Sequence, residues 1–184
     1  MGYILEIIQK FDVSMLNFFF GNIRFGILDA AMPIVSVLGD YGAIWVLAAS
    51  ALICIKRYRT VGITVLAALL LCGLIGNLGL KQLVARPRPY VLNPEIVLLI
   101  PQPADYSFPS GHTMSSFASS TVIFFHNRLA GCFTFLFGIL MAFSRLYLCV
   151  HYATDVLGGI VIGTGIGITA VFVIRIARKR LHGV

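Results

Sequence analysis

Charged side chains are scarce in this sequence. Only 11% of its 184 residues are Asp, Glu, Lys or Arg, whereas 59% are hydrophobic. The mean hydropathy of +0.94 is well above that of an ordinary water-soluble domain. The composition therefore excludes the usual soluble fold classes and predicts one membrane-embedded helical domain over residues 1–184, with its core at about 60–175.

Cysteine and acidic residues are also few. The four cysteines fall in apolar stretches without C-x-x-C spacing, which argues against a zinc site and against a disulfide framework. Seven acidic residues are too few to suggest a two-metal site. We therefore expect packing roles for the cysteines, no metal requirement and no cofactor.

The N-terminus lacks the basic first region and small-residue cleavage site of a removable signal peptide. Polar Glu6, Lys10 and Asp12 alternate with apolar residues, a pattern typical of an amphipathic helix lying in the membrane interface. Residues 1–40 are thus predicted to be interfacial, although a sixth crossing is an alternative. A separate helix at 27–39 would end in a break at Gly39 and Asp40.

Long apolar stretches predict the membrane crossings. Five are expected, at about 41–56, 60–80, 111–127, 131–150 and 152–175. The fold class is accordingly an all-α polytopic bundle of five to six spans. Glycine recurs at 159, 163 and 167, which permits close helix packing, either within the chain or in a dimer.

Basic residues predict which way the bundle faces. Those at alternate span ends mark the cytoplasmic side: Lys56, Arg57, Arg59, Arg128, Arg175, Arg178, Lys179 and Arg180. The net charge of +7 is explained by this topology and by anionic lipid, so no nucleic-acid partner is expected. His126 and His182 lie at the same ends and are interpreted as interfacial residues.

Four cations fall on the opposite, outer side: Lys81, Arg86, Arg88 and Arg145. Cations that are translocated or buried near a span end need a local partner. Asp155 can pair with only one of them, and the same side offers only Glu95 and Asp105 besides. We therefore expect a surplus of positive charge without a protein counter-ion, which a bound anion would supply. For Arg86 a headgroup contact and simple solvation stay open.

Two outer segments carry features that suit phosphate. Pro87 and Pro89 end a helix and hold Arg88 extended, so that Arg88 and Lys81 can face one point. At the start of another helix, Ser110 can cap the free backbone N–H groups. Gly111 allows close approach of a ligand, and His112 on the first turn could protonate a leaving oxygen.

A third segment on the outer side holds the remaining candidate catalytic residues. His151 and Asp155 are four residues apart, and in a continuous helix they would share a face. The carboxylate could then hold one ring nitrogen and leave the other free to attack phosphorus. With Lys81, Arg88 and Arg145 supplying positive charge, these residues suit phosphoryl transfer.

In order, K-x6-R-P (81–89), P-S-G-H (109–112) and S-R-x5-H-x3-D (144–155) resemble the three motifs of the type 2 phosphatidic acid phosphatase superfamily. The resemblance implies a six-helix core, a phosphohistidine on His151, His112 as general acid and Asp155 as the residue that orients His151. It further implies that the transferred phosphate is bound, without a metal, by Lys81, Arg88, Ser110, Gly111 and Arg145.

Within that family the short chain and the HYATDVLGG run are similar to bacterial undecaprenyl diphosphate phosphatases of the bacitracin-resistance type, and also to phosphatidylglycerophosphate phosphatases. The expected partner is a lipid phosphate or diphosphate in a bacterial cytoplasmic membrane, reached from outside. Phosphatidate is another possible substrate. A membrane transporter and a silent lipid-binding protein are the alternatives from other classes.

Overall fold

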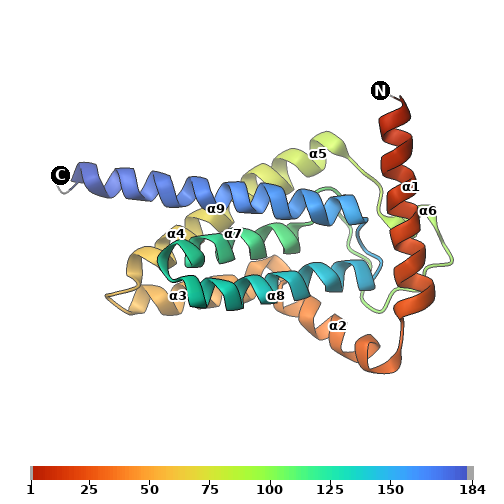
Figure 1. The fold of residues 1–184 in the computed structure, drawn as a ribbon, viewed down its shortest axis with the longest axis horizontal. Helices are drawn as coiled ribbons and strands as arrows, with labels where there is room; N and C mark the ends of the chain where they lie inside the picture. The colour runs from red at the N-terminus through yellow and green to blue at the C-terminus, as the bar shows by residue number, and fades with distance from the viewer. Residues whose placement is uncertain (1, 182–184) are drawn as a thin grey trace.

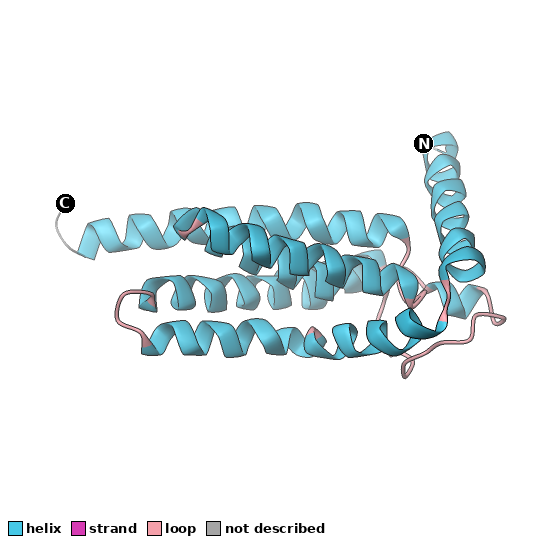
Figure 2. Ribbon diagram, turned by 60° about the horizontal axis from the view of Figure 1, so that its bottom comes forward, coloured by secondary structure: helices cyan, strands magenta, loops and turns pink. Residues whose placement is uncertain are grey.

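The computed structural model describes residues 2–181, so His182 lies outside the described residues. Within this range the chain is helical and carries no strand (Figure 2). Four long segments run along one axis (Figure 1). The first joins α4 (Arg59–Leu71), η3 (Cys72–Leu80) and α5 (Lys81–Val84), and the others are α7 (Gly111–His126), α8 (Arg128–Tyr147) and α9 (Ala153–Leu181).

Helix α7 lies at the centre of the bundle. It packs against α8, α9 and α4, and its residues Thr113–Val122 are all buried. The polar members of this run are serines and threonines, whose small side chains let helices approach closely in a membrane. The first turn of α7 carries Gly111 and His112, so the best-packed helix of the bundle also positions them.

Among residues 2–181, three helical segments are long and apolar enough to cross a bilayer: Arg59–Leu92, Arg128–Tyr147 and Ala153–Arg180. Helices α2 (Gly26–Leu38) and α3 (Ala43–Cys54) meet that test only as a pair, bent by 46°. The bend confirms the predicted break at Gly39 and Asp40. The short η2 (Asp40–Gly42) occupies it, with positive φ at Tyr41 and Gly42.

The glycine repeat of α9 faces α7. A Cβ atom on Gly159 would lie 2.8 Å from the carbonyl oxygen of Ser110, and one on Gly163 would lie 2.3 Å from that of Met114. On Gly167 it would lie 2.6 Å from the Ala118 oxygen. The repeat therefore packs an internal helix pair and gives no support to the dimer alternative.

Helix α1 (Gly2–Phe18) crosses the end of the bundle at a steep angle (Figures 1 and 2). A turn, η1 (Phe19–Ile23), connects it to α2. Most side chains of α1 are exposed, including Ile4 and Phe11, whereas Asp12 is buried. A helix that lies across a bundle end and exposes apolar residues suits the predicted interfacial position.

Candidate active site

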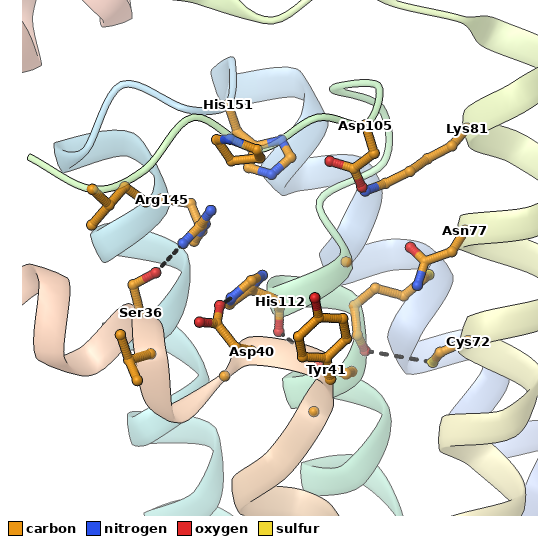
Figure 3. Close-up of a pocket in the computed structure, with 18 of the residues that line it drawn as sticks. Ser36, Asp40, Tyr41, Cys72, Asn77, Lys81, Asp105, His112, Arg145 and His151 are labelled. Carbon is orange, nitrogen blue, oxygen red and sulfur yellow. Dashed lines mark hydrogen bonds and ion pairs between the residues drawn. The ribbon is translucent and has the colours of Figure 1, made fainter. Parts of the chain in front are cut away.

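A cavity of about 740 Å³ opens at the end of the bundle that α1 crosses. Six of the eight predicted site residues line it: Lys81, Arg88, Gly111, His112, Arg145 and His151. They come from four separate parts of the chain, and Figure 3 shows Lys81, His112, Arg145 and His151 facing one space. The other two, Ser110 and Asp155, are fully buried behind the lining.

Lys81 and Arg88 converge on the carboxylate of Asp105. Lys81 donates to Oδ2, and Arg88 Nη2 donates to Oδ1 at 2.5 Å. The expectation of cations without a protein counter-ion was therefore wrong for this pair, because the loop between α6 (Pro89–Leu92) and α7 folds back over them. Burial alone would raise the pKa of Asp105, but the two cations outweigh it and lower that pKa to about 2.

Arg145 has no such partner. Its side chain is 2% exposed, and its Nη1 donates to the hydroxyl of Ser36 on α2. Within residues 2–181 no hydrogen-bond acceptor reaches its Nε, and no carboxylate pairs with it. A buried guanidinium without a counter-ion favours an anion in the cavity that it lines.

His151 precedes α9 instead of lying within it. Helix α8 ends at Tyr147 and α9 begins at Ala153, so His151 lies in the break between the predicted spans 131–150 and 152–175, and no continuous helix joins it to Asp155. The turn between the helices nevertheless brings His151 Nδ1 to 3.6 Å from Asp155 Oδ2. The two groups are therefore close, although this distance is longer than a hydrogen bond.

The environment of His151 indicates its tautomer. Arg88 Nη1 lies 3.2 Å from Nε2, and because a guanidinium can only donate, Nε2 must be an acceptor. The proton of the neutral ring then sits on Nδ1, the atom nearest Asp155. Burial lowers the pKa of His151 to about 3, aided by the charges of Arg88 and Arg145 and opposed by Asp155. The ring is thus a neutral base with its lone pair on Nε2.

Asp155 is held by several donors. Its Oδ2 accepts from the Ser107 hydroxyl at 2.5 Å and from the Tyr152 N–H at 2.8 Å, and its Oδ1 accepts from Arg86 Nη1 at 2.6 Å. The carboxylate also lies in the first turn of α9, where a negative charge is favourable. Asp155 is consequently fixed beside His151.

Arg86 links this carboxylate to the N-terminal helix. Its Nη2 pairs with Asp12 Oδ2 at 2.5 Å, and Asp12 also accepts from the backbone N–H and the hydroxyl of Thr154. The Arg86 guanidinium stacks over the Tyr152 ring, 4.1 Å from its centroid. Arg86 therefore makes structural ion pairs, an arrangement that the two alternatives left open for it did not include. Sequence reasoning missed Asp12, whose only signal was the scarcity of acids.

His112 pairs with another acid that sequence reasoning missed. Its Nε2 lies 2.9 Å from Asp40 Oδ1, at the break between α2 and α3. Ser110 is the residue before α7, as predicted, but its hydroxyl bonds to that of Thr113 and does not cap the backbone. Its own N–H donates to the Asp155 carbonyl at 3.1 Å, so the starts of α7 and α9 are tied together.

These features define a class of protein: a helical membrane protein with a cationic cavity, a neutral histidine held beside a carboxylate, and a second histidine at a helix start. Such a site suits transfer of an anionic group. Residues 61–180 match the family model described as the PAP2 superfamily. The chain belongs to this superfamily.

Two curated relatives are particularly informative. The chain is 39% identical over 112 residues to undecaprenyl-diphosphatase BcrC of Bacillus subtilis, covering 61% of this chain and 55% of that protein. It is 30% identical over 137 residues to an undecaprenyl-diphosphatase of Sulfolobus acidocaldarius, covering 73% and 66%. The chain thus spans a little over half to two thirds of their length.

Solved structures agree on the fold. Aquifex aeolicus LpxE superimposes with a TM-score of 0.72 at 25% identity, over 86% of this chain and 93% of that one. A PAP2-type phosphatidylglycerolphosphate phosphatase of Bacillus subtilis gives 0.73 at 23% identity, over 95% and 87%. The second likeness concerns the fold alone.

Proposed function

We propose that this protein is a lipid phosphatase that forms a phosphohistidine on His151, with undecaprenyl diphosphate as its substrate. The observation that carries the proposal is the neutral His151, whose Nε2 lies 3.2 Å from Arg88 at the wall of a cationic cavity. The choice of lipid is supported by the two relatives named as undecaprenyl-diphosphatases.

In the proposed reaction the transferred phosphoryl group takes the place of the Asp105 carboxylate between Lys81 and Arg88, with Arg145 on its other side. His151 Nε2 bonds to phosphorus as the bond from phosphorus to the leaving oxygen breaks, and His112 protonates that oxygen. Water then attacks the phosphohistidine, gives its proton to His112 and releases phosphate. The cations offset charge that develops on the equatorial oxygens.

Asp155 would stabilise His151 when phosphorylation makes its ring cationic, because the carboxylate stands beside Nδ1. The three cations supply the charge that a metal would otherwise provide, so we propose a metal-independent reaction. Full activity in EDTA is expected, and activity lost in EDTA and restored by a divalent ion would contradict this part.

The proposed topology places the site outside the cytoplasmic membrane of a bacterium. Arg57, Arg175 and Arg178 line a second hollow at the far end of the bundle, where the chain ends (Figure 1). A basic end is favoured on the cytoplasmic side. With the bent pair α2–α3 and the 16-residue, centrally packed α7 counted as crossings, the bundle would have five spans.

The test is phosphate release from detergent-solubilised undecaprenyl diphosphate, phosphatidylglycerophosphate and phosphatidate. Undecaprenyl diphosphate should have the highest kcat/KM, and a preference for another lipid would replace the substrate proposed here. His151→Ala should abolish release and prevent labelling from a 32P-labelled substrate. Release that persists in His151→Ala would refute the phosphohistidine, and no release by the unaltered protein from any lipid would favour a transporter or a silent lipid-binding protein.

A further inference from the structure

The imidazole of His112 is held by a group outside the motif segments. Asp40 Oδ1 lies 2.9 Å from His112 Nε2, although 72 residues separate them in the chain. Both side chains line the cavity, and Figure 3 shows them facing each other below Arg145 and His151. The contact therefore joins the α2–α3 break to the start of α7.

The backbone at the break is shaped to fit this contact. A Cβ on Gly39 would lie 2.7 Å from His112 Cδ2 and 2.7 Å from the Met141 methyl carbon, so only glycine leaves room for the ring. Tyr41 follows Asp40 with φ of +54°. A left-handed tyrosine costs about 1 kcal/mol or more and persists where surrounding structure demands it. The glycine leaves room for the His112 ring, and the positive φ of Tyr41 lies directly after Asp40 in the same turn.

The charges around the His112 ring make a neighbouring carboxylate favourable. The other charged groups lining the cavity near His112 include Lys81 and Arg145, and both oppose a positive charge on its ring. A general acid must carry a proton when substrate is bound. Asp105 is already bonded to Lys81 and Arg88, so Asp40 is the cavity carboxylate in contact with His112.

We infer that Asp40 is a positioning residue that orients the His112 imidazole toward the leaving oxygen and favours its protonated form against the opposing charges of Lys81 and Arg145. The inference rests on the proposed function. Two carboxylates would then serve two histidines: Asp155 supports the nucleophile and Asp40 supports the acid. The proton that His112 gives to the leaving oxygen returns from the attacking water in the second step, so Asp40 itself neither gains nor loses a proton overall.

A leaving-group comparison tests this inference. Phosphatidate releases diacylglycerol, a poor leaving group whose alkoxide oxygen needs a proton, whereas p-nitrophenyl phosphate releases a stable phenolate that does not. In Asp40→Asn, kcat on phosphatidate should fall by about tenfold or more, a part of what general acid catalysis supplies. The rate on p-nitrophenyl phosphate should change by less than about threefold.

Glu95→Gln is the matched control, because it removes an exposed carboxylate from the loop after α6 without contacting His112. Both of its rates should equal those of the unaltered protein. Asp40→Ser gives a second test with a smaller polar side chain, and the inhibition constant for inorganic phosphate reports whether the cavity remains intact.

The possible outcomes separate the two proposals. Equal losses of Asp40→Asn on both substrates, or no loss on either, would overturn the role of Asp40 and leave the lipid phosphatase proposal standing. If the unaltered protein hydrolyses neither substrate nor any lipid diphosphate, the proposed function itself fails. A loss confined to phosphatidate, repeated in Asp40→Ser, supports the inference.

Discussion

Replacing Gly163 by alanine tests how the α7–α9 contact positions the site. The added Cβ would lie 2.3 Å from the carbonyl oxygen of Met114, whereas ordinary contact begins at 3.4 Å. The obstacle is backbone, which cannot rotate away, so the helices must separate locally by about 1 Å. Such overpacking costs about 1–3 kcal/mol of folding free energy.

Separating the two helices should also displace catalytic groups. His112 lies in the first turn of α7 and Asp155 in the first turn of α9, and the two starts are joined by the hydrogen bond from Ser110 N–H to the Asp155 carbonyl. Misplacement of catalytic groups by about 1 Å can cost up to about 100-fold in rate. Gly163→Ala should therefore lower kcat by about tenfold or more and lower the melting temperature in detergent by roughly 5 °C.

Gly165→Ala provides the control on the same helix. Its added Cβ would have nothing within 4 Å, and alanine favours a helix over glycine by up to about 1 kcal/mol. Melting followed by intrinsic fluorescence, and phosphate release at saturating substrate, should show a stable and active variant. If Gly163→Ala matches Gly165→Ala in both measurements, the α7–α9 packing described here is wrong.

Three further predictions concern charged groups. Asp12→Asn breaks the buried pair with Arg86, so we expect a loss of roughly 3 kcal/mol in denaturant unfolding together with lower kcat; an unchanged midpoint would refute this role. Asp105→Asn should bind inorganic phosphate about tenfold more tightly, measured as its inhibition constant, because a competing carboxylate is removed; weaker binding would contradict the competition. Burial lowers the pKa of His151 to about 3 in the folded protein, against an ordinary value of 6.5. As the pH falls, the unfolded chain therefore binds this proton before the folded protein does. The free energy of unfolding should thus be unaffected above pH 6.5 and fall from there toward pH 3, and the fall should be smaller in His151→Asn. Equal losses in the two proteins would refute the lowered pKa of His151.

The acid dependence has a second, separate range. The pKa of Asp105 is lowered from its ordinary 3.8 to about 2, so its contribution is complete above pH 4 and is lost as the pH falls toward 2. A loss of stability between pH 6 and 4 lies above this range and is therefore not due to the Asp105 ion pair. The comparison with His151→Asn identifies the part of the loss that is due to His151.

Much of the fold could be predicted because it depends on local sequence. The apolar stretches at 60–80, 131–150 and 152–175 correspond to long helical segments, since each carries enough apolar side chains to be stable in lipid whatever its neighbours. The break at Gly39 and Asp40 was predicted from residue type as well. The break at 151 between two predicted spans was anticipated too, whereas the contacts of Asp155 with Ser107 and Arg86 were not, because they join segments far apart in the chain.

The chain by itself determined that this is a membrane protein, and its motif spacing identified six residues that line one cavity. Only the tertiary structure decided how the charges are paired: Asp105 with Lys81 and Arg88, Asp12 with Arg86, and Asp40 with His112. Residue type and periodicity are written into each segment, whereas an ion pair depends on which distant segments meet. Asp12 and Arg86 lie 74 residues apart, and only folding makes them neighbours.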